Sequence, residues 1–539
     1  MLVKDIPKLP RFRLQWRGAP TCAGRRPNGA GLTLLLLLGS MSPIVGCSSA
    51  ADRAAGARDE GEAMAARGDH LGARERFDAA VALRDDQPEI WIARARSQLA
   101  LGDYGGAFGS YSSALDLDRT NREALDAVGQ IALLAGKSDE AERIANQILT
   151  LAPDDSAALY VKGSVLLQRG RLEAAAATID QGLRMHPNDE NLLVLKSRLL
   201  TRHGDLASAE RILRPVFDRQ SANPLVFDQL ADVYGRQFDG RQILLVRARA
   251  ARARSDDAQV LYEFGKQLLA SGVIGEGIRV LESSIKQQKK ASNDRSILLA
   301  IAESNVNADA LSRALVAQRS LSAATRLACA RYAILADRPS AARSILLGVS
   351  RDQRTDDWFA LVAYLLARQD RTVAAASLAA AILQKDARSN FALASRALTS
   401  AKIGLLDEAL RDARLAVSDA PNQVEPVEVL ATIFTLRGDA AAARATYNEA
   451  FNRNRDNILF LRALVLSRPE ATVSDHGALV RDFTARNPTV ISGWVLRRSM
   501  CIALRDMPCV ARAGVIAKGL TGAPLGIRPT EERVGPPVA

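Results

Sequence analysis

A spacing of 34 residues between recurring small side chains constrains this chain more than any other feature. Segments that begin at residues 54, 88, 122, 156, 190, 224 and 258 align without an insertion or deletion. Their fifteenth position is glycine in six of the seven segments, and their twentieth is alanine in the first five. Their eighth position is always small, in Gly61, Ala95, Gly129, Gly163, Ser197, Ala231 and Gly265. A period of this length indicates an array of stacked supersecondary units.

Each recurring residue has a physical role in a pair of antiparallel helices. Small residues at positions 8 and 20 allow the two helix backbones of a unit to approach closely. Glycine at position 15 ends the first helix, because it adopts left-handed backbone angles at little cost. Asp69, Asp103 and Asp205 follow this glycine and can cap the second helix. The pattern resembles the tetratricopeptide repeat. The resemblance implies an all-α, right-handed superhelical solenoid of antiparallel helix pairs.

The repeat changes phase after residue 291. Seven regular units occupy residues 54–291, and a degenerate unit follows at 292–321. Four more units begin at 322, 356, 390 and 424 and extend to residue 457. We therefore expect 11 to 12 repeats, divergent helices at 458–520 that cap the array, and a disordered, proline-containing tail at 521–539.

Residues 1–46 are expected to be a signal peptide. A basic stretch precedes an apolar run from Leu32 to Val45, which is shorter than the ~20 residues of a transmembrane helix. Ile44, two permissive residues and Cys47 resemble the lipobox of bacterial lipoproteins. The resemblance implies cleavage before Cys47, a diacylglycerol on its thiol and acylation of its new amine, for example with palmitate. A plain secretory signal with an incidental cysteine is the alternative.

Cleavage there would leave residues 47–53 as a lipid-anchored tether. Ser48 follows the cysteine, and a serine at this place favours the outer membrane, with the protein facing the periplasm.

The net charge of +12 does not indicate nucleic-acid binding. Seven basic residues and one acidic residue lie in the first 46 positions, so half of the excess belongs to the leader. The remainder is spread over the chain without aromatic interleaving, which is typical of solvated helix faces.

No residue pattern in the sequence indicates catalysis. The four histidines, His70, His186, His203 and His476, do not have metal-motif spacing with another ligand. Phosphate-binding loops, nucleophile elbows and dinucleotide fingerprints are also missing from the sequence. We therefore expect no enzyme activity, no metal and no cofactor.

The cysteines have different expected roles. Cys329 occupies the small position 8 of its unit, where a buried packing thiol is expected. Cys501 and Cys509 flank a predicted turn between two helices, close enough to meet if the helices pack antiparallel. An envelope location would permit a disulfide between them. The sequence leaves both a bridge and two free thiols open.

A partner is expected on the inner surface of the solenoid. In the resembling family, positions 2, 5, 9 and 12 of each unit face that groove. Several of these positions carry polar or amphipathic residues that packing does not explain, and tyrosine and arginine are common interface anchors. The candidate contacts are Arg96, Tyr160, Arg198, Asp228, Asp232, Tyr262 and Lys266. A solvated groove without a binding role is the alternative for each residue.

Two functions follow from these features. The first is a non-catalytic scaffold that binds envelope proteins or peptide segments, with polysaccharide export favoured over pilus assembly and outer-membrane assembly because the array is long. The second is a solenoid that presents a C-terminal glycan-binding module. In that module Trp494, with Arg497 and Arg498, would stack on a sugar, unless Trp494 is a core anchor of a helix.

Overall fold

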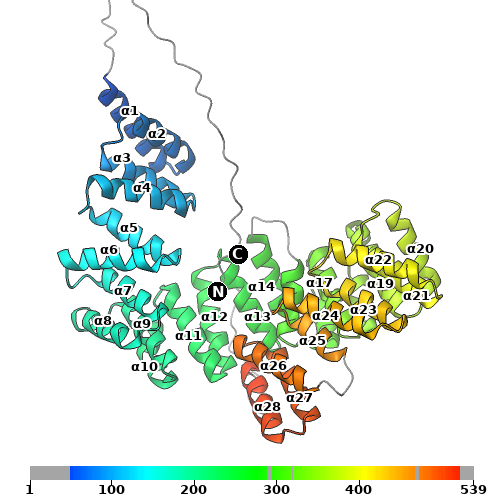
Figure 1. The fold of residues 1–539 in the computed structure, drawn as a ribbon. Helices are drawn as coiled ribbons and strands as arrows, with labels where there is room; N and C mark the ends of the chain where they lie inside the picture. The colour runs from blue at the N-terminus through cyan, green and yellow to red at the C-terminus, as the bar shows by residue number, and fades with distance from the viewer. Residues whose placement is uncertain (1–48, 288–293, 319, 468–472, 523–539) are drawn as a thin grey trace, which may run out of the picture.

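The computed structural model describes residues 49–287, 294–318, 320–467 and 473–522. Within these ranges the chain forms 28 α-helices and one short 3-10 helix, and no β-strand. The helices follow one another as antiparallel pairs in a curved array (Figure 1). The prediction of an all-α superhelical solenoid is confirmed.

The first array consists of seven helix pairs, whose second helices begin after a turn of a few residues. Its helices are α1 (Ala50–Ala66), α2 (His70–Leu83), α3 (Pro88–Ala100), α4 (Tyr104–Leu117), α5 (Arg122–Leu134), α6 (Ser138–Leu151), α7 (Ser156–Gln168), α8 (Leu172–Met185), α9 (Glu190–Arg202), α10 (Leu206–Asp218), α11 (Pro224–Gln237), α12 (Gly240–Ala253), α13 (Ala258–Ala270) and α14 (Ile274–Gln287).

The turn within each pair has the chemistry that the sequence predicts. Gly68 has a φ of 83°, in the left-handed region. The side chain of Asp69 then accepts a hydrogen bond from the backbone nitrogen of Gly72 at 3.0 Å, which caps α2. In the sixth unit Phe238 replaces the glycine and still adopts a φ of 57°, a conformation that is uncommon for a bulky residue.

Small residues bring the helices of a pair into close contact. A Cβ atom at Gly265 would lie 2.8 Å from Cγ of Leu281, and one at Gly277 would lie 3.0 Å from the backbone oxygen of Gly265. Ala73 and Ala107, at position 20 of their units, are completely buried. Small residues on one helix of a pair therefore leave room for large side chains of the other, as Gly265 does for Leu281.

The second array begins with two short helices and then returns to longer pairs. Its helices are α15 (Asp294–Glu303), α16 (Ala308–Val316), α17 (Ala323–Leu335), α18 (Pro339–Leu347), the 3-10 helix η1 (Arg351–Gln353), α19 (Asp356–Arg368), α20 (Thr372–Leu383), α21 (Asn390–Lys402), α22 (Leu406–Asp419), α23 (Val424–Leu436), α24 (Ala440–Arg453) and α25 (Ile458–Leu466). The degenerate unit corresponds to the pair α15 and α16.

The second array turns tightly enough to bring distant units together. Arg331 on α17 forms a buried ion pair with Glu425 on α23, with Nε and Oε1 2.8 Å apart. Arg295 on α15 donates a hydrogen bond to the side-chain oxygen of Asn454 at 3.2 Å. The inner side of this array is therefore occupied by its own side chains.

The last three helices follow α25 and also fold back along the chain, which the expectation of capping helices at 458–520 did not include. The C-terminal module consists of α26 (Val473–Arg486), α27 (Ile491–Ala503) and α28 (Met507–Thr521). It packs against the middle of the chain, where α28 contacts α12 and α13 (Figure 1).

Both apolar and polar contacts hold the C-terminal module in this position. The rings of Phe238 and Trp494 meet edge to face, with centroids 5.7 Å apart. Gln267 donates a hydrogen bond to the backbone oxygen of Leu520 at 3.3 Å, and Ser492 donates one to the backbone oxygen of Glu303 at 3.3 Å. Burial of the apolar faces of α27 and α28 explains why they return to the middle, because they share one core cluster with α11 to α13.

The expected tether at 47–53 is also shorter than predicted. Helix α1 begins at Ala50, because Ser49 and Asp52 form a capping box and alanine follows. The signal peptide at 1–46, the lipidation residue Cys47 and residues 523–539 of the expected tail lie outside the described residues. No helix in the described part of the chain combines the length and apolarity needed to cross a membrane.

Candidate binding groove

An open cavity lies on the inner surface of the first array, between the first helices of three consecutive units. Its volume is about 260 Å³, and α7, α9 and α11 supply its walls. Two of the predicted contacts, Arg198 and Asp232, line it together. They occupy the same repeat position in adjacent units, as does Ser164 in the unit before.

The charge in this cavity is mainly positive. Arg198, Arg202 and Arg236 line it, with Asp232 as the single acidic residue of the lining. Asp232 is paired with Arg236, whose Nε lies 3.0 Å away, and Arg202 donates to the backbone oxygen of Leu167 at 2.7 Å. Arg198 is half-buried and has no ion-pair or hydrogen-bond partner among the described residues. Its guanidinium is therefore available to a bound group.

Arg96 is engaged within the array. Its guanidinium binds both carboxylate oxygens of Glu123 in the next unit, with Nε 2.6 Å from Oε1. The hydroxyl of Tyr111 donates to the same carboxylate at 3.3 Å. This hydrogen bonding by Arg96 holds the pKa of Glu123 below its ordinary value, while burial raises the pKa of Tyr111 to about 12. Arg96 therefore connects neighbouring units.

Tyr160 is half-buried on α7. Its ring packs against two apolar clusters, one around Ile179 and Leu195 and the other around Val161 and Val165. The ring therefore contributes to packing between units and also keeps part of its surface exposed.

Asp228, Tyr262 and Lys266 belong to a separate ion network near the C-terminal module. Arg247 pairs with Asp228 at 3.1 Å, and Lys266 lies 3.5 Å from Glu263 and 3.3 Å from Glu303. The ammonium of Lys266 also lies 5.7 Å from the ring centroid of Tyr262.

The C-terminal module closes one side of this network. Thr489 and Ile491 line the same small cavity, of about 60 Å³, as Glu263, Lys266 and Glu303. Burial opposes the charge on Lys266, but Glu263 and Glu303 raise the pKa of this lysine above its ordinary value. Of the seven predicted contacts, Arg198 and Asp232 line the cavity between α7, α9 and α11, and Lys266 lines this smaller one.

Two charged residues that sequence reasoning missed lie in the second array. Arg368 and Glu428 form an ion pair at 3.3 Å. Burial raises the pKa of Glu428 to about 7, although Arg368 lowers it and Glu425 adds to the rise. Glu428 is the fifth residue of the unit that begins at 424, a position expected to face the groove. This position is the sequence signal that could have identified it.

The described residues contain no group of three or more His, Cys, Asp or Glu side chains that could hold a metal. Cys501 and Cys509 form a disulfide, with Cα atoms 5.8 Å apart, between the end of α27 and the start of α28. Cys329 is completely buried at its small repeat position, and burial raises the pKa of its thiol to about 12. This thiol therefore has a packing role.

Comparison with known protein families supports the repeat assignment. The tetratricopeptide repeat family matches residues 58–122 and 129–190. The chain therefore contains tetratricopeptide repeats in these segments. No curated protein matches the sequence.

Several solved structures share the repeat architecture. A tetratricopeptide repeat protein from Parabacteroides merdae is 18% identical, with a TM-score of 0.35, over 46% of this chain and 97% of that one. MamA from Desulfovibrio magneticus is 19% identical, with a TM-score of 0.29, over 31% and 94%. Pseudomonas aeruginosa pilF is 17% identical, with a TM-score of 0.30, over 38% and 92%. Likenesses at this level carry no functional assignment.

Proposed function

We propose that this protein is a non-catalytic scaffold that binds a segment of another protein in the cavity between α7, α9 and α11. The observation that carries the proposal is the half-buried, unpaired Arg198 in that cavity. An acidic group on a partner would form charge-assisted hydrogen bonds with this guanidinium. Tetratricopeptide repeats generally bind protein partners, which supports this function.

The charge of the cavity favours a partner segment with an acidic side chain. Among the residues that the structure describes, no carboxylate pairs with Arg198 or Arg202, and Asp232 pairs with Arg236. An aspartate or glutamate on an extended peptide could accept two hydrogen bonds from Arg198 in the bidentate geometry that guanidinium groups favour.

We also propose an envelope location, supported by the lipobox resemblance at Cys47. Acyl chains on Cys47 would anchor the array at the outer membrane, facing the periplasm. Polysaccharide export is the favoured pathway because of the length of the array. Pilus assembly and outer-membrane assembly are the alternatives, and flanking genes for a polymerase, an exporter or a pilin would distinguish them.

Site-specific photocrosslinking in living cells tests the binding proposal. A photoreactive amino acid at Gln168, which is exposed and lines the cavity, should capture a discrete envelope protein. Arg198→Glu in the same chain should abolish that product, because it reverses the charge that would bind the partner. Photoreactive substitution of Arg211, exposed on α10, is the matched control. Equal capture from both positions, or capture that survives Arg198→Glu, would refute the proposal.

The glycan-stacking alternative loses support from the position of Trp494. This side chain is only 6% exposed, and its indole nitrogen donates to the backbone oxygen of Pro488 at 2.8 Å. Its ring also contacts Phe238. Trp494 is therefore mainly a core anchor, and only a small part of it lines the open cavity between α26, α27 and α28.

A further inference from the structure

We propose that the C-terminal module holds a binding site for a small molecule that carries a phosphate or carboxylate group. The site is an open cavity of about 280 Å³ between α26, α27 and α28. It is separate from the groove of the first array.

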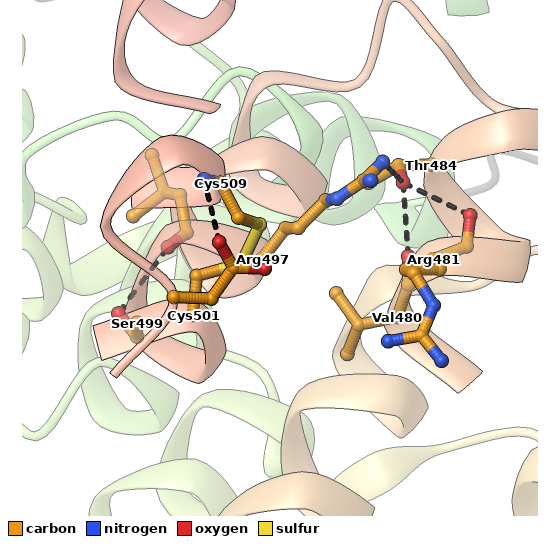
Figure 2. The surroundings of a disulfide bond; sticks show 9 residues. Val480, Arg481, Thr484, Arg497, Ser499, Cys501 and Cys509 are labelled. Carbon is orange, nitrogen blue, oxygen red and sulfur yellow. Dashed lines mark hydrogen bonds between the residues drawn. A yellow bond between two sulfur atoms is a disulfide. The ribbon is translucent and has the colours of Figure 1, made fainter. Parts of the chain in front are cut away.

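Each of the three helices contributes one arginine to this cavity. Arg481 comes from α26, Arg497 from α27 and Arg512 from α28. Arg497 extends from the region of the disulfide across to Thr484 on α26, and Arg481 lies on the same stretch of α26 (Figure 2). The packing of the three consecutive helices thus places three cations around one cavity.

These three cations have no anionic partner in the described part of the chain. No ion pair joins Arg481, Arg497 or Arg512 to a carboxylate there, and Arg497 instead donates to the hydroxyl of Thr484 at 3.0 Å. Asp506, the single acidic residue of the lining, caps α28 by accepting a hydrogen bond from the backbone nitrogen of Cys509 at 3.1 Å. The cavity therefore has a net positive charge.

A neighbouring arginine differs from these three because it is paired with carboxylates. Arg486, also on α26, bonds to Asp482 at 3.0 Å and to Asp456. Burial and repulsion from Arg512 and Arg481 lower the pKa of Arg497, although Asp506 opposes this shift. An oxyanion placed among the three guanidinium groups would remove this repulsion.

The walls of the cavity indicate the class of ligand. Guanidinium groups bind phosphate and carboxylate oxygens through paired hydrogen bonds. Met500, Leu504 and Ala513 add apolar surface beside the arginines. The volume of about 280 Å³ leaves room for an organic body attached to the anion. Phosphate and carboxylate share this chemistry, and the experiment below distinguishes them.

The disulfide contributes to the shape of the site. Cys501 and Cys509 both line the cavity, and their bond joins the end of α27 to the start of α28 (Figure 2). It therefore limits the separation of the helices that carry Arg497 and Arg512.

Calorimetric titration of the purified full chain tests the proposal with four probes: inorganic phosphate, glucose 6-phosphate, glucuronate and neutral glucose. We expect glucose 6-phosphate or glucuronate to bind at millimolar or lower concentration and glucose not to bind. Preference for the phosphorylated probe would identify a phosphate as the acidic group, and preference for glucuronate would identify a carboxylate.

Arg497→Gln and Arg512→Gln should each weaken binding about tenfold or more, since each removes a charge-assisted hydrogen bond. Arg498→Gln is the matched control, because Arg498 is exposed on the same helix and does not line the cavity. Circular dichroism would verify that all variants remain folded. Failure of every charged probe to bind, or an equal loss with Arg498→Gln, would overturn the proposal.

Discussion

The guanidinium of Arg331 and the carboxylate of Glu425 form a buried ion pair across the second array, although the residues are 94 positions apart in sequence. Their side chains are only 4% and 1% exposed. Arg331 also lies over the ring of Phe391, 5.2 Å from its centroid. The pair therefore joins α17 to α23 directly, across several units of this array.

Removing one member of the pair should destabilise the second array. Glu425→Ala removes the carboxylate that pairs with the buried guanidinium of Arg331, which costs about 3–5 kcal/mol. Hydrogen exchange of the α17 and α23 amides, followed by mass spectrometry, would measure the lower opening free energy. Arg388→Gln is the control, because Arg388 pairs with Asp419 on the surface and its loss should cost less than about 1 kcal/mol.

A paired replacement separates charge from packing in the same experiment. Arg331→Met combined with Glu425→Leu removes both charges and keeps the volume, so protection should recover toward that of the natural chain. If the backbone amides of Glu425→Ala were as protected from hydrogen exchange as those of Arg388→Gln, the ion pair would not hold the array together.

The repeat could be predicted from the sequence because its determinants are local. Gly68, Ala73 and Gly265 each act within their own helix pair, so their position in the repeat carries the necessary information. The Arg331–Glu425 pair depends on small rotations that accumulate over several units. The spacing of residues within one unit does not specify the total rotation over several units, so the contact between α17 and α23 was not predicted.

The position of the C-terminal module was missed for a related reason. Phe238 is the one departure from glycine at the fifteenth position of the seven regular units. A phenylalanine with a φ of 57° requires stabilising contacts, and the ring of Trp494 provides one. The unusual residue was visible in the sequence, but its partner lies in a segment without repeat phase. Arg481 and Arg512 also lie outside the repeat, so the sequence did not indicate that they line one cavity.

A side chain at Gly265 should disturb the packing of one helix pair. In Gly265→Ala the new methyl would lie 2.8 Å from Leu281 and 3.1 Å from the backbone oxygen of Gly277. Because the backbone can yield only partly, we expect a loss of about 1–3 kcal/mol, measured by thermal unfolding. Gly56→Ala is the control, since nothing lies within 4 Å of its Cβ position. Gly56→Ala should increase the free energy of unfolding by about 0.5–1 kcal/mol, because alanine has a higher helix propensity than glycine. Equal effects of the two substitutions would contradict this account.

Ionisation of Glu428 should lower the stability of the second array as pH rises toward 7. The pKa of this group is about 7 in the folded chain and 4.5 ordinarily, so the folded state holds the proton more tightly. Its contribution is complete below about pH 4.5 and is lost as pH rises through about 7. Glu428→Gln should remove this slope, which is worth about 1–3 kcal/mol. Urea titrations at several pH values would measure the difference between the two proteins. Parallel pH profiles would show that Glu428 titrates normally.

Replacement of Cys47 should remove the protein from the outer membrane. If acyl chains on Cys47 anchor the array, Cys47→Ala removes the attachment site and also prevents cleavage by the lipoprotein route. We expect loss of metabolic palmitate labelling, and a shift of the protein out of the outer-membrane fraction. Cys329→Ala is the control, because that thiol is buried and should leave labelling unchanged. Palmitate labelling that persists in Cys47→Ala would exclude this residue as the anchor.

The disulfide between Cys501 and Cys509 should be present in the purified protein and should stabilise the C-terminal module. Peptide mapping without reductant should show the two cysteines joined, with a mass two hydrogens below that of the dithiol. Their separation of 8 residues closes a short loop, so the bond should contribute about 2 kcal/mol through the unfolded chain. In denaturant without reductant an alkylating reagent should modify Cys329 but not Cys501 or Cys509. Because the bond joins the helices that carry Arg497 and Arg512, the double serine variant should also bind the anionic sugar probe more weakly. Alkylation of both cysteines before reduction would show that the bond does not form.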